Sequence, residues 1–298
     1  FANFIWSPTI TDHKFLSGFT MRYQDYDDNT IATPTTDKQF IPGIFIQDEW
    51  TISRHFSVLG GTRLDHYTRH GLIFSPRLNL KAKAGALTTF RANFGTGFRL
   101  VNLFTEDHAF ITGQREVVIE EELKPERSIN GSLNINQLVI LGESQGSLDL
   151  DMYYTFFTNK IIPDYSDPSF IRYGNSAGNA ITKGIGVTWS HEFVFPLSFS
   201  LGATYQQTTE QVPTSDGSLT DRNVEFAPEY SGTFTLNYTW EKTGIQFAYS
   251  AQLTGPMQLP EVYDLDDQGT PLPQPRPITS DAFSIHNLQL TRNIGQSV

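Results

Sequence analysis

The amino-acid sequence predicts an all-β protein in which long antiparallel strands cross a membrane as part of a β-barrel. Three observations carry this prediction. Apolar and polar residues alternate with a period of two, the alternating segments are long, and short connections alternate with long ones. A helical membrane protein is excluded, because the longest aliphatic run, residues 138–141, is far shorter than the ~18–20 apolar residues that a spanning helix needs.

The alternation is clearest between residues 197 and 206. Apolar side chains occupy the odd positions from Leu197 to Tyr205, and serine, glycine, threonine or glutamine occupies the even positions. Successive side chains of a strand point to opposite faces, so this segment has one apolar and one polar face. Similar alternation is found in residues 15–23, 44–50, 90–94, 129–135, 148–156, 185–189, 230–240 and 245–253. These patterns predict about thirteen strands.

The lengths of the strands and of their connections favour a membrane barrel. The predicted strands have roughly 9–14 residues, against ~5–6 in soluble sheets and ~9–11 or more for crossing a bilayer at a tilt. Short connections are predicted near residues 53–54, 84–86, 142–146, 195–196 and 241–244, and long ones over about 25–38, 98–124, 162–174, 209–227 and 255–281, with a brief exception at 69–72. Outer-membrane barrels have short periplasmic turns and long external loops, so we expect the long connections to face outside.

Aromatic residues near the strand ends add to the membrane interpretation. Trp50, Tyr238 and Trp240 lie near short connections, whereas Tyr23 and Tyr205 lie near long ones. Two such groups resemble the aromatic girdles at the two membrane–water interfaces. The alternative is a soluble all-β binding module, such as a lectin, a propeller or a sandwich, in which the same aromatics pack inside a shared core.

Composition and charge exclude several classes of function. The chain has 21 Lys and Arg against 32 Asp and Glu, which gives a net charge of −11. A nucleic-acid partner is not expected, since phosphate-binding proteins normally present a basic face. The chain contains no cysteine, so disulfides and thiolate metal sites are excluded.

Neither a metal site nor a catalytic site is expected. His66 and His70 are four residues apart, which in a strand is ~13 Å and too far to share one ion. The aspartates at 264, 266 and 267 precede Gly269, but their spacing does not fit a calcium-binding loop. The carboxylates of residues 120–122 form a solvated run, and no Walker or dinucleotide motif occurs. We therefore expect no enzyme activity, no cofactor and no metal.

Five short motifs follow one another between residues 45 and 128. They read Gln-Asp-Glu-Trp at 47–50, Gly-Thr-Arg-Leu-Asp at 61–65, Ser-Pro-Arg at 75–77, Gly-Thr-Gly-Phe-Arg at 95–99 and Leu-Lys-Pro-Glu at 123–126. This succession resembles the barrel of TonB-dependent outer-membrane receptors, in which these motifs occur in the same order. The sequence departs from the family pattern at Leu100 and Val101, where the family often has Ala-Pro, and it does not end on an aromatic residue.

The resemblance implies a larger protein and a transport function. The family barrel has about 22 strands and is filled by an N-terminal plug that contacts the inner-membrane energy transducer TonB. We therefore expect residues 1–298 to be a partial barrel, with the plug and the other strands outside this chain. The implied function is energised uptake across the bacterial outer membrane, most often of a ferric siderophore. Corrinoid or glycan uptake and a passive porin-like barrel are the alternatives.

For contact with the solute we single out aromatic and cationic residues of the predicted long connections. These are Phe98, Arg99, Phe104, Arg115, Tyr165, Tyr173 and Tyr263. Aromatic surface combined with occasional positive charge suits an anionic iron chelate or a large flat ligand. A second set, Glu49, Arg63, Asp65, Arg77 and Arg91, is predicted to point inward. We expect those charges to pair with one another or with the plug rather than to contact the substrate.

Overall fold

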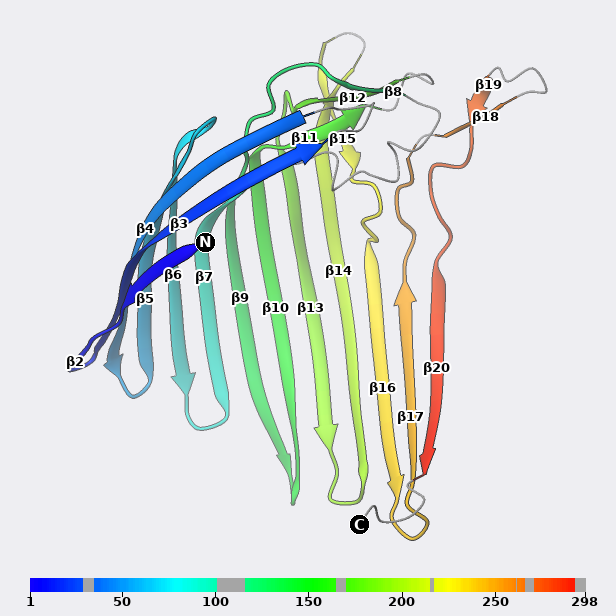
Figure 1. The fold of residues 1–298 in the computed structure, drawn as a ribbon. Coiled ribbons are helices and arrows are strands. Elements are labelled where there is room, and N and C mark those ends of the chain that lie inside the picture. The colour runs from blue at the N-terminus through cyan, green and yellow to red at the C-terminus, as the bar shows by residue number, and fades with distance from the viewer. Residues whose placement is uncertain are drawn as a thin grey trace.

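The main feature of the fold is one large, curved, antiparallel sheet (Figure 1). The computed structural model describes residues 1–28, 35–100, 116–164, 170–214, 217–260, 262–265 and 271–292. Within these ranges every regular element is a strand. No membrane-spanning helix is therefore found there. The main sheet has 15 strands. Thirteen of them pair with one another in sequence order, and the short strands β2 and β15 pair with β3 and β14 outside this path. This confirms the predicted fold class and the estimate of about thirteen successive strands.

The strands of this path have the following bounds: β1 Ala2–Trp6, β3 His13–Asp28, β4 Thr35–Ser53, β5 Phe56–Tyr67, β6 Gly71–Ala84, β7 Thr88–Arg99, β9 Glu126–Leu141, β10 Ser144–Asn159, β13 Ala180–Glu192, β14 Leu197–Pro213, β16 Tyr230–Trp240, β17 Ile245–Thr254 and β20 Phe283–Arg292. The side strands are β2 Thr9–Ile10 and β15 Leu219–Asn223. Two small sheets contain β8 Glu116–Ile119, β11 Ile161–Asp164 and β12 Phe170–Asn175, and β18 Tyr263–Leu265 with β19 Pro271–Pro275.

The two faces of the sheet differ in polarity, as the alternation predicts. We call the face that carries Ile44, Leu133 and Leu201 the apolar face, and the opposite one the polar face. These three side chains are 60%, 51% and 49% exposed, and within the described residues no second sheet covers them. Leaving so many large apolar side chains in water costs roughly 25 cal/mol per Å², so the apolar face is suited to lipid. The predicted alternative of a soluble sandwich core is therefore not what the chain forms.

The two ends of the sheet carry different connections. The predicted short turns between β4 and β5, β6 and β7, β9 and β10, β13 and β14, and β16 and β17 all lie at one end, which we call the turn end (Figure 1). The small sheets lie at the opposite end, the loop end (Figure 1).

Several strands are longer than predicted, and they continue into segments that we expected to be loops. The strand β4 has 19 residues and β14 has 17. The ladder between β3 and β4 runs on to Asp28 opposite Thr35, inside the predicted connection 25–38. The period-two signal ends where both faces are polar, whereas backbone pairing does not depend on that signal.

The sheet is open. The outermost strands of the path are β1 and β20, and no pairing between them occurs in the described part of the chain. This agrees with the prediction of a partial barrel and not of a barrel closed by these strands alone.

Candidate functional site at the loop end

The first four sequence motifs meet in one row on the polar face. Gln47 of β4 lies opposite Gly61 of β5, which lies opposite Arg77 of β6, which in turn lies opposite Gly95 of β7. The guanidinium of Arg77 donates a hydrogen bond to Gln47 Oε1 across β5. A Cβ atom at Gly61 would lie 3.2 Å from the Cβ of Gln47, so the glycine leaves the space that the arginine crosses. The motifs thus specify one structural contact across four strands.

An ion pair between the half-buried Arg63 and the buried Asp65 lies nearer the loop end of the same face. Arg63 donates from Nε to Asp65 Oδ2 at 2.6 Å and from Nη2 to Asp65 Oδ1 at 2.6 Å, and it also reaches Thr20 Oγ1 at 2.8 Å. Asp65 is 2% exposed. A Cβ on Gly43 would lie 2.2 Å from Asp65 Oδ1, so this glycine makes room for the carboxylate. A buried carboxylate needs such a partner, and the fork geometry of arginine supplies it.

The other charges predicted to point inward also have polar partners. Arg91 Nη1 donates to Asn134 Oδ1 at 2.9 Å, and Glu49 Oε2 lies 3.9 Å from Lys14 Nζ. Pairing of the predicted charges with one another is therefore confirmed for Arg63 and Asp65, and the other three contact other residues of the sheet. Pairing with a plug stays a prediction.

The fourth and fifth motifs meet at the loop end through Arg99 and Glu126. Arg99 Nε donates to Glu126 Oε2 at 2.7 Å, and Glu126 Oε1 accepts a hydrogen bond from the backbone N–H of Ile161 at 3.0 Å. Glu126 is 5% exposed, whereas the side chain of Arg99 keeps 54% of its surface exposed. The carboxylate therefore joins β7, β9 and β11, and the guanidinium it holds faces solvent.

Phe98 belongs to an apolar cluster at this end. It packs against the buried side chains of Ile41, Tyr67 and Ile73. Its ring meets that of Tyr67 edge to face, with the centroids 5.8 Å apart. Arg22 Nη2 donates to the Tyr67 hydroxyl at 3.0 Å. Phe98 is therefore held in place by packing, and only part of its ring is available to a solute.

A small sheet forms a second layer of the loop end, with β12 between β8 and β11. Tyr173 of β12 is 1% exposed, so in this structure its ring does not face solvent. Asn175 ends β12 and holds the connection between β8 and β9: its backbone N–H donates to Glu121 Oε1 at 2.9 Å, and its Oδ1 accepts from the N–H of Lys124 at 2.8 Å. The carboxylate run at 120–122 is exposed, as predicted, and the side chain of Glu121 nevertheless accepts this hydrogen bond.

The buried carboxylate of Glu210 in β14 joins two other segments of the loop end. Glu210 is 4% exposed and accepts from Lys160 Nζ at 2.9 Å and from Arg222 Nη2 at 2.8 Å. Sequence reasoning missed Glu210, because it lies in a segment without alternation. Glu126 is the last residue of the Leu-Lys-Pro-Glu motif, which is the sequence signal that points to it.

Four other predicted residues are described in part or not at all. Phe104, Arg115 and Tyr165 lie outside the described residues. Tyr263 begins β18 opposite Pro275, and only its backbone is described. Its neighbour Asp264 accepts from Arg276 Nε at 2.8 Å, and this hydrogen bond lowers the pKa of the carboxyl group.

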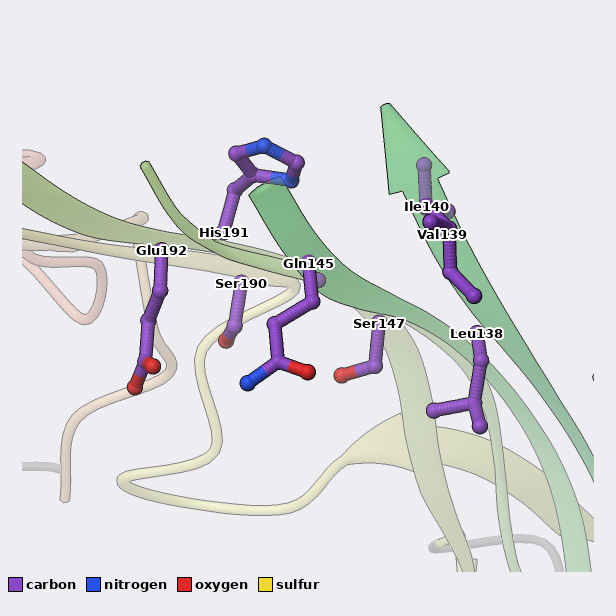
Figure 2. A pocket seen from close by; sticks show the side chains of 9 residues that line it. Leu138, Val139, Ile140, Gln145, Ser147, Ser190, His191 and Glu192 are labelled. Atoms are coloured by element: carbon purple, nitrogen blue, oxygen red, sulfur yellow. The ribbon is translucent and has the colours of Figure 1, made fainter. Parts of the chain in front are cut away.

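A separate hollow of about 300 Å³ lies at the turn end. Its lining includes Leu138, Gln145, Ser147, Ser190, His191 and Glu192. Figure 2 shows the ring of His191 on the side of the sheet opposite to Ser190 and Glu192. His191 is 2% exposed and packs against Trp189, Phe193 and Phe199. Across the described residues, no group of three or more His, Asp or Glu is placed to hold a metal ion.

Comparisons with known proteins identify the relatives of the chain. A family model described as TonB dependent receptor-like, beta-barrel, matches residues 3–296. The iron-regulated outer membrane virulence protein of Vibrio cholerae serotype O1 (El Tor Inaba) is 27% identical over 248 residues. That alignment covers 78% of this chain and 37% of the relative, so the chain spans well under half of the length of that protein.

Solved structures share the fold at low sequence identity. The siderophore receptor PirA from Pseudomonas aeruginosa matches with a TM-score of 0.64 at 19% identity, over 85% of this chain and 44% of that one. A variant of the ferric enterobactin receptor from the same organism, in complex with enterobactin, matches with a TM-score of 0.69 at 15% identity, over 99% and 46%. The FrpB iron transporter from Neisseria meningitidis matches with a TM-score of 0.66 at 13% identity, over 96% and 46%. The open sheet with its lipid-facing side and its row of shared motifs, together with a family match over nearly the whole chain, shows that this chain belongs to the TonB-dependent receptor β-barrel family of the bacterial outer membrane.

Proposed function

We propose that the protein containing this chain takes up a ferric siderophore across the outer membrane with energy delivered through TonB. The observation that carries the proposal is the family match together with an iron-regulated outer membrane relative at 27% identity. Structural neighbours that are named siderophore receptors or iron transporters add support at the level of the fold.

The geometry of the loop end supports binding of an anionic chelate there. The half-exposed side chain of Arg99 is oriented by the buried Glu126. The preceding residue, Phe98, has a partly buried ring that packs on the cluster of Ile41, Tyr67 and Ile73. A cationic group held by a buried partner loses little conformational entropy when it binds. We include Phe104, Arg115, Tyr165 and Tyr263 in the proposed binding region, because they follow in the same set of connections.

We further propose that strands and a plug outside residues 1–298 complete the receptor. Among the residues that the structure describes, the edge strands β1 and β20 have backbone groups without a ladder partner on one side. In hydrocarbon each unsatisfied group costs several kcal/mol, so additional strands must pair with both edges. A plug on the polar face would give the energy transducer its point of contact.

The test is uptake of radioactive iron by cells that carry the complete receptor and lack other siderophore receptors. We expect ⁵⁵Fe-siderophore accumulation that disappears when TonB is deleted or a protonophore is added. In binding assays Arg99→Gln should raise the Kd of the active siderophore about tenfold, since a charge-assisted contact is worth ~1.5 kcal/mol. The matched control is Arg292→Gln in β20 at the turn end, which should leave the Kd unchanged.

The outcomes separate the alternatives. Uptake that persists without TonB would favour a passive porin-like barrel. TonB-dependent uptake of a corrinoid or a glycan, with no accumulation of any iron chelate, would replace the proposed substrate while keeping the mechanism.

A further inference from the structure

The apolar face carries a row of three polar side chains toward the loop end. Tyr154 of β10, Lys183 of β13 and Gln207 of β14 lie opposite one another in the register of these neighbouring strands. All three are exposed. Paired strands are ~4.8 Å apart, so the three side chains span roughly 10 Å. Ammonium, amide and phenol groups are all hydrogen-bond donors, so the row is a continuous set of donors.

The row is embedded in apolar surface. The next row toward the turn end consists of Met152, Ile185 and Tyr205, and the next row toward the loop end begins with Phe156 and Ile181. Ile185 is 41% and Tyr205 is 59% exposed. A lysine at this depth keeps its stem on apolar surface and extends its charge toward the interface.

In the five long strands around the row, charge on the apolar face has one sign, whereas the short strand β15 places Asp221 on that face opposite Gln211. In β9, β10, β13, β14 and β16 the register places two cations there, Arg127 and Lys183, and no carboxylate, although the chain has a net charge of −11. Among the described residues neither cation has an ion-pair partner.

Two pairs of charged groups are found elsewhere on the apolar face. Asp25 lies 3.1 Å from Lys38, and Asp48 lies 2.7 Å from His13. Lys183 differs from these four groups in having no ion-pair partner within the described chain, a property that it shares with Arg292 of β20, opposite Ile245 at the turn end.

We propose that this row binds the phosphate-bearing headgroup of an anionic lipid in the leaflet at the loop end. Lys183 forms the ion pair with the phosphate, Gln207 and Tyr154 donate hydrogen bonds to its oxygens, and the acyl chains lie over Met152, Ile185 and Tyr205. The positive charge of Lys183 on a lipid-facing surface, without a protein counter-ion, is complementary to the negative charge of the lipid phosphate. The strands β10, β13 and β14 are interior to the sheet (Figure 1), so strands that pair with β1 or β20 leave the row uncovered.

The test measures local lipid preference in nanodiscs that contain the complete receptor. The reporter is a fluorophore on Thr209→Cys, one row from Lys183 on the same face; residues 1–298 contain no other cysteine, and any cysteine elsewhere in the complete receptor is replaced by serine. The probes are brominated phosphatidic acid and brominated phosphatidylcholine, each diluted into ordinary phosphatidylcholine, and the measurement is quenching of the fluorophore. We expect about fivefold stronger association of phosphatidic acid, as one lysine near an anionic lipid contributes ~1 kcal/mol.

Matched variants identify the residue responsible. Lys183→Gln should reduce the preference to nearly one, and Lys183→Arg should keep it. Lys81→Gln removes a cation from the polar face and should keep the preference, while heat-modifiable gel mobility reports that all variants are folded. Equal quenching by the two lipids in the unmodified protein overturns the proposal, and so does a preference that survives Lys183→Gln or falls equally with Lys81→Gln. If inorganic phosphate abolished the extra quenching by brominated phosphatidic acid, the row would bind the free phosphate ion. That result would overturn the proposal of a lipid headgroup.

Discussion

A residue of this sheet and its neighbour along the strand meet different surroundings. Val187 is 40% exposed on the apolar face, and Thr188, the next residue of β13, lies on the polar face opposite Asp149 and Gly202. This one-residue difference decides which substitutions the sheet tolerates, because register leaves no freedom to exchange the two faces.

Val187→Arg should impair assembly of the complete receptor in the outer membrane. A cation at the bilayer midplane of such a barrel costs ~2–4 kcal/mol, whereas Thr188→Arg places the same charge on the polar face. The measurement is the amount of heat-modifiable receptor in outer-membrane fractions. Equal loss from both variants would contradict a lipid-facing assignment of the apolar face.

Close packing sets a second limit, at Gly146. A Cβ at this position would lie 2.4 Å from the carbonyl oxygen of Ser190 and 2.5 Å from His191 Nδ1. Since backbone and a buried ring occupy this space, Gly146→Ala should lower the free energy of unfolding by ~1–3 kcal/mol. Urea titration of the folded receptor measures this. Gly60→Ala is the control, because nothing lies within 4 Å of a Cβ there, and its midpoint should change far less.

Among the elements, the connections at the loop end are ordered by a few buried carboxylates. Glu126 and Glu210 each accept from groups on other elements and are almost fully buried. A buried carboxylate that loses its charge leaves its cationic partners without a counter-charge, which destabilises the element they hold.

Glu210→Gln should loosen the hairpin of β14 and β15. Neutralising the carboxylate weakens the contacts to Lys160 and Arg222, and we expect cleavage near residues 214–218 to become several-fold faster in limited proteolysis of the complete receptor. Asp221→Asn in the same hairpin changes an exposed carboxylate and should leave the rate unchanged. An equal rate for both variants and the unmodified receptor would show that Glu210 does not order this hairpin.

For the whole molecule, the separation of short and long connections implies one orientation in the membrane. Short turns face the periplasm in barrels of this type, so the loop end faces outside. The proposed lipid row and the proposed chelate site then both belong to the outward end, on opposite faces of the sheet.

An epitope tag tests this orientation. Inserted beside Gly217, between β14 and β15, the tag should be stained by antibody on intact cells. Inserted beside Lys242, in the turn between β16 and β17, it should be stained only after permeabilisation. The reverse pattern would show that the barrel is oriented the other way.

The sequence alone determined the strands, their two faces and the end of the sheet at which each connection lies. These properties are local, because alternation from Leu197 to Tyr205 assigns each side chain to a face without knowledge of the partner strand. The family was also readable from motifs at residues 47–126, each of which is a short run of chain. Strand ends were less accurate, since the polar continuations of β3 and β4 carry no alternation.

Only the tertiary structure decided which loop-end residues are buried and which face solvent. The contacts of Glu126 with Ile161 and of Glu210 with Lys160 join residues 35 and 50 positions apart, and Asn175 meets Glu121 from 54 positions away. Tyr173 looked like an exposed aromatic residue in the sequence and is 1% exposed in the structure. No periodic pattern encodes such contacts, because they arise when the sheet brings distant connections to the same end.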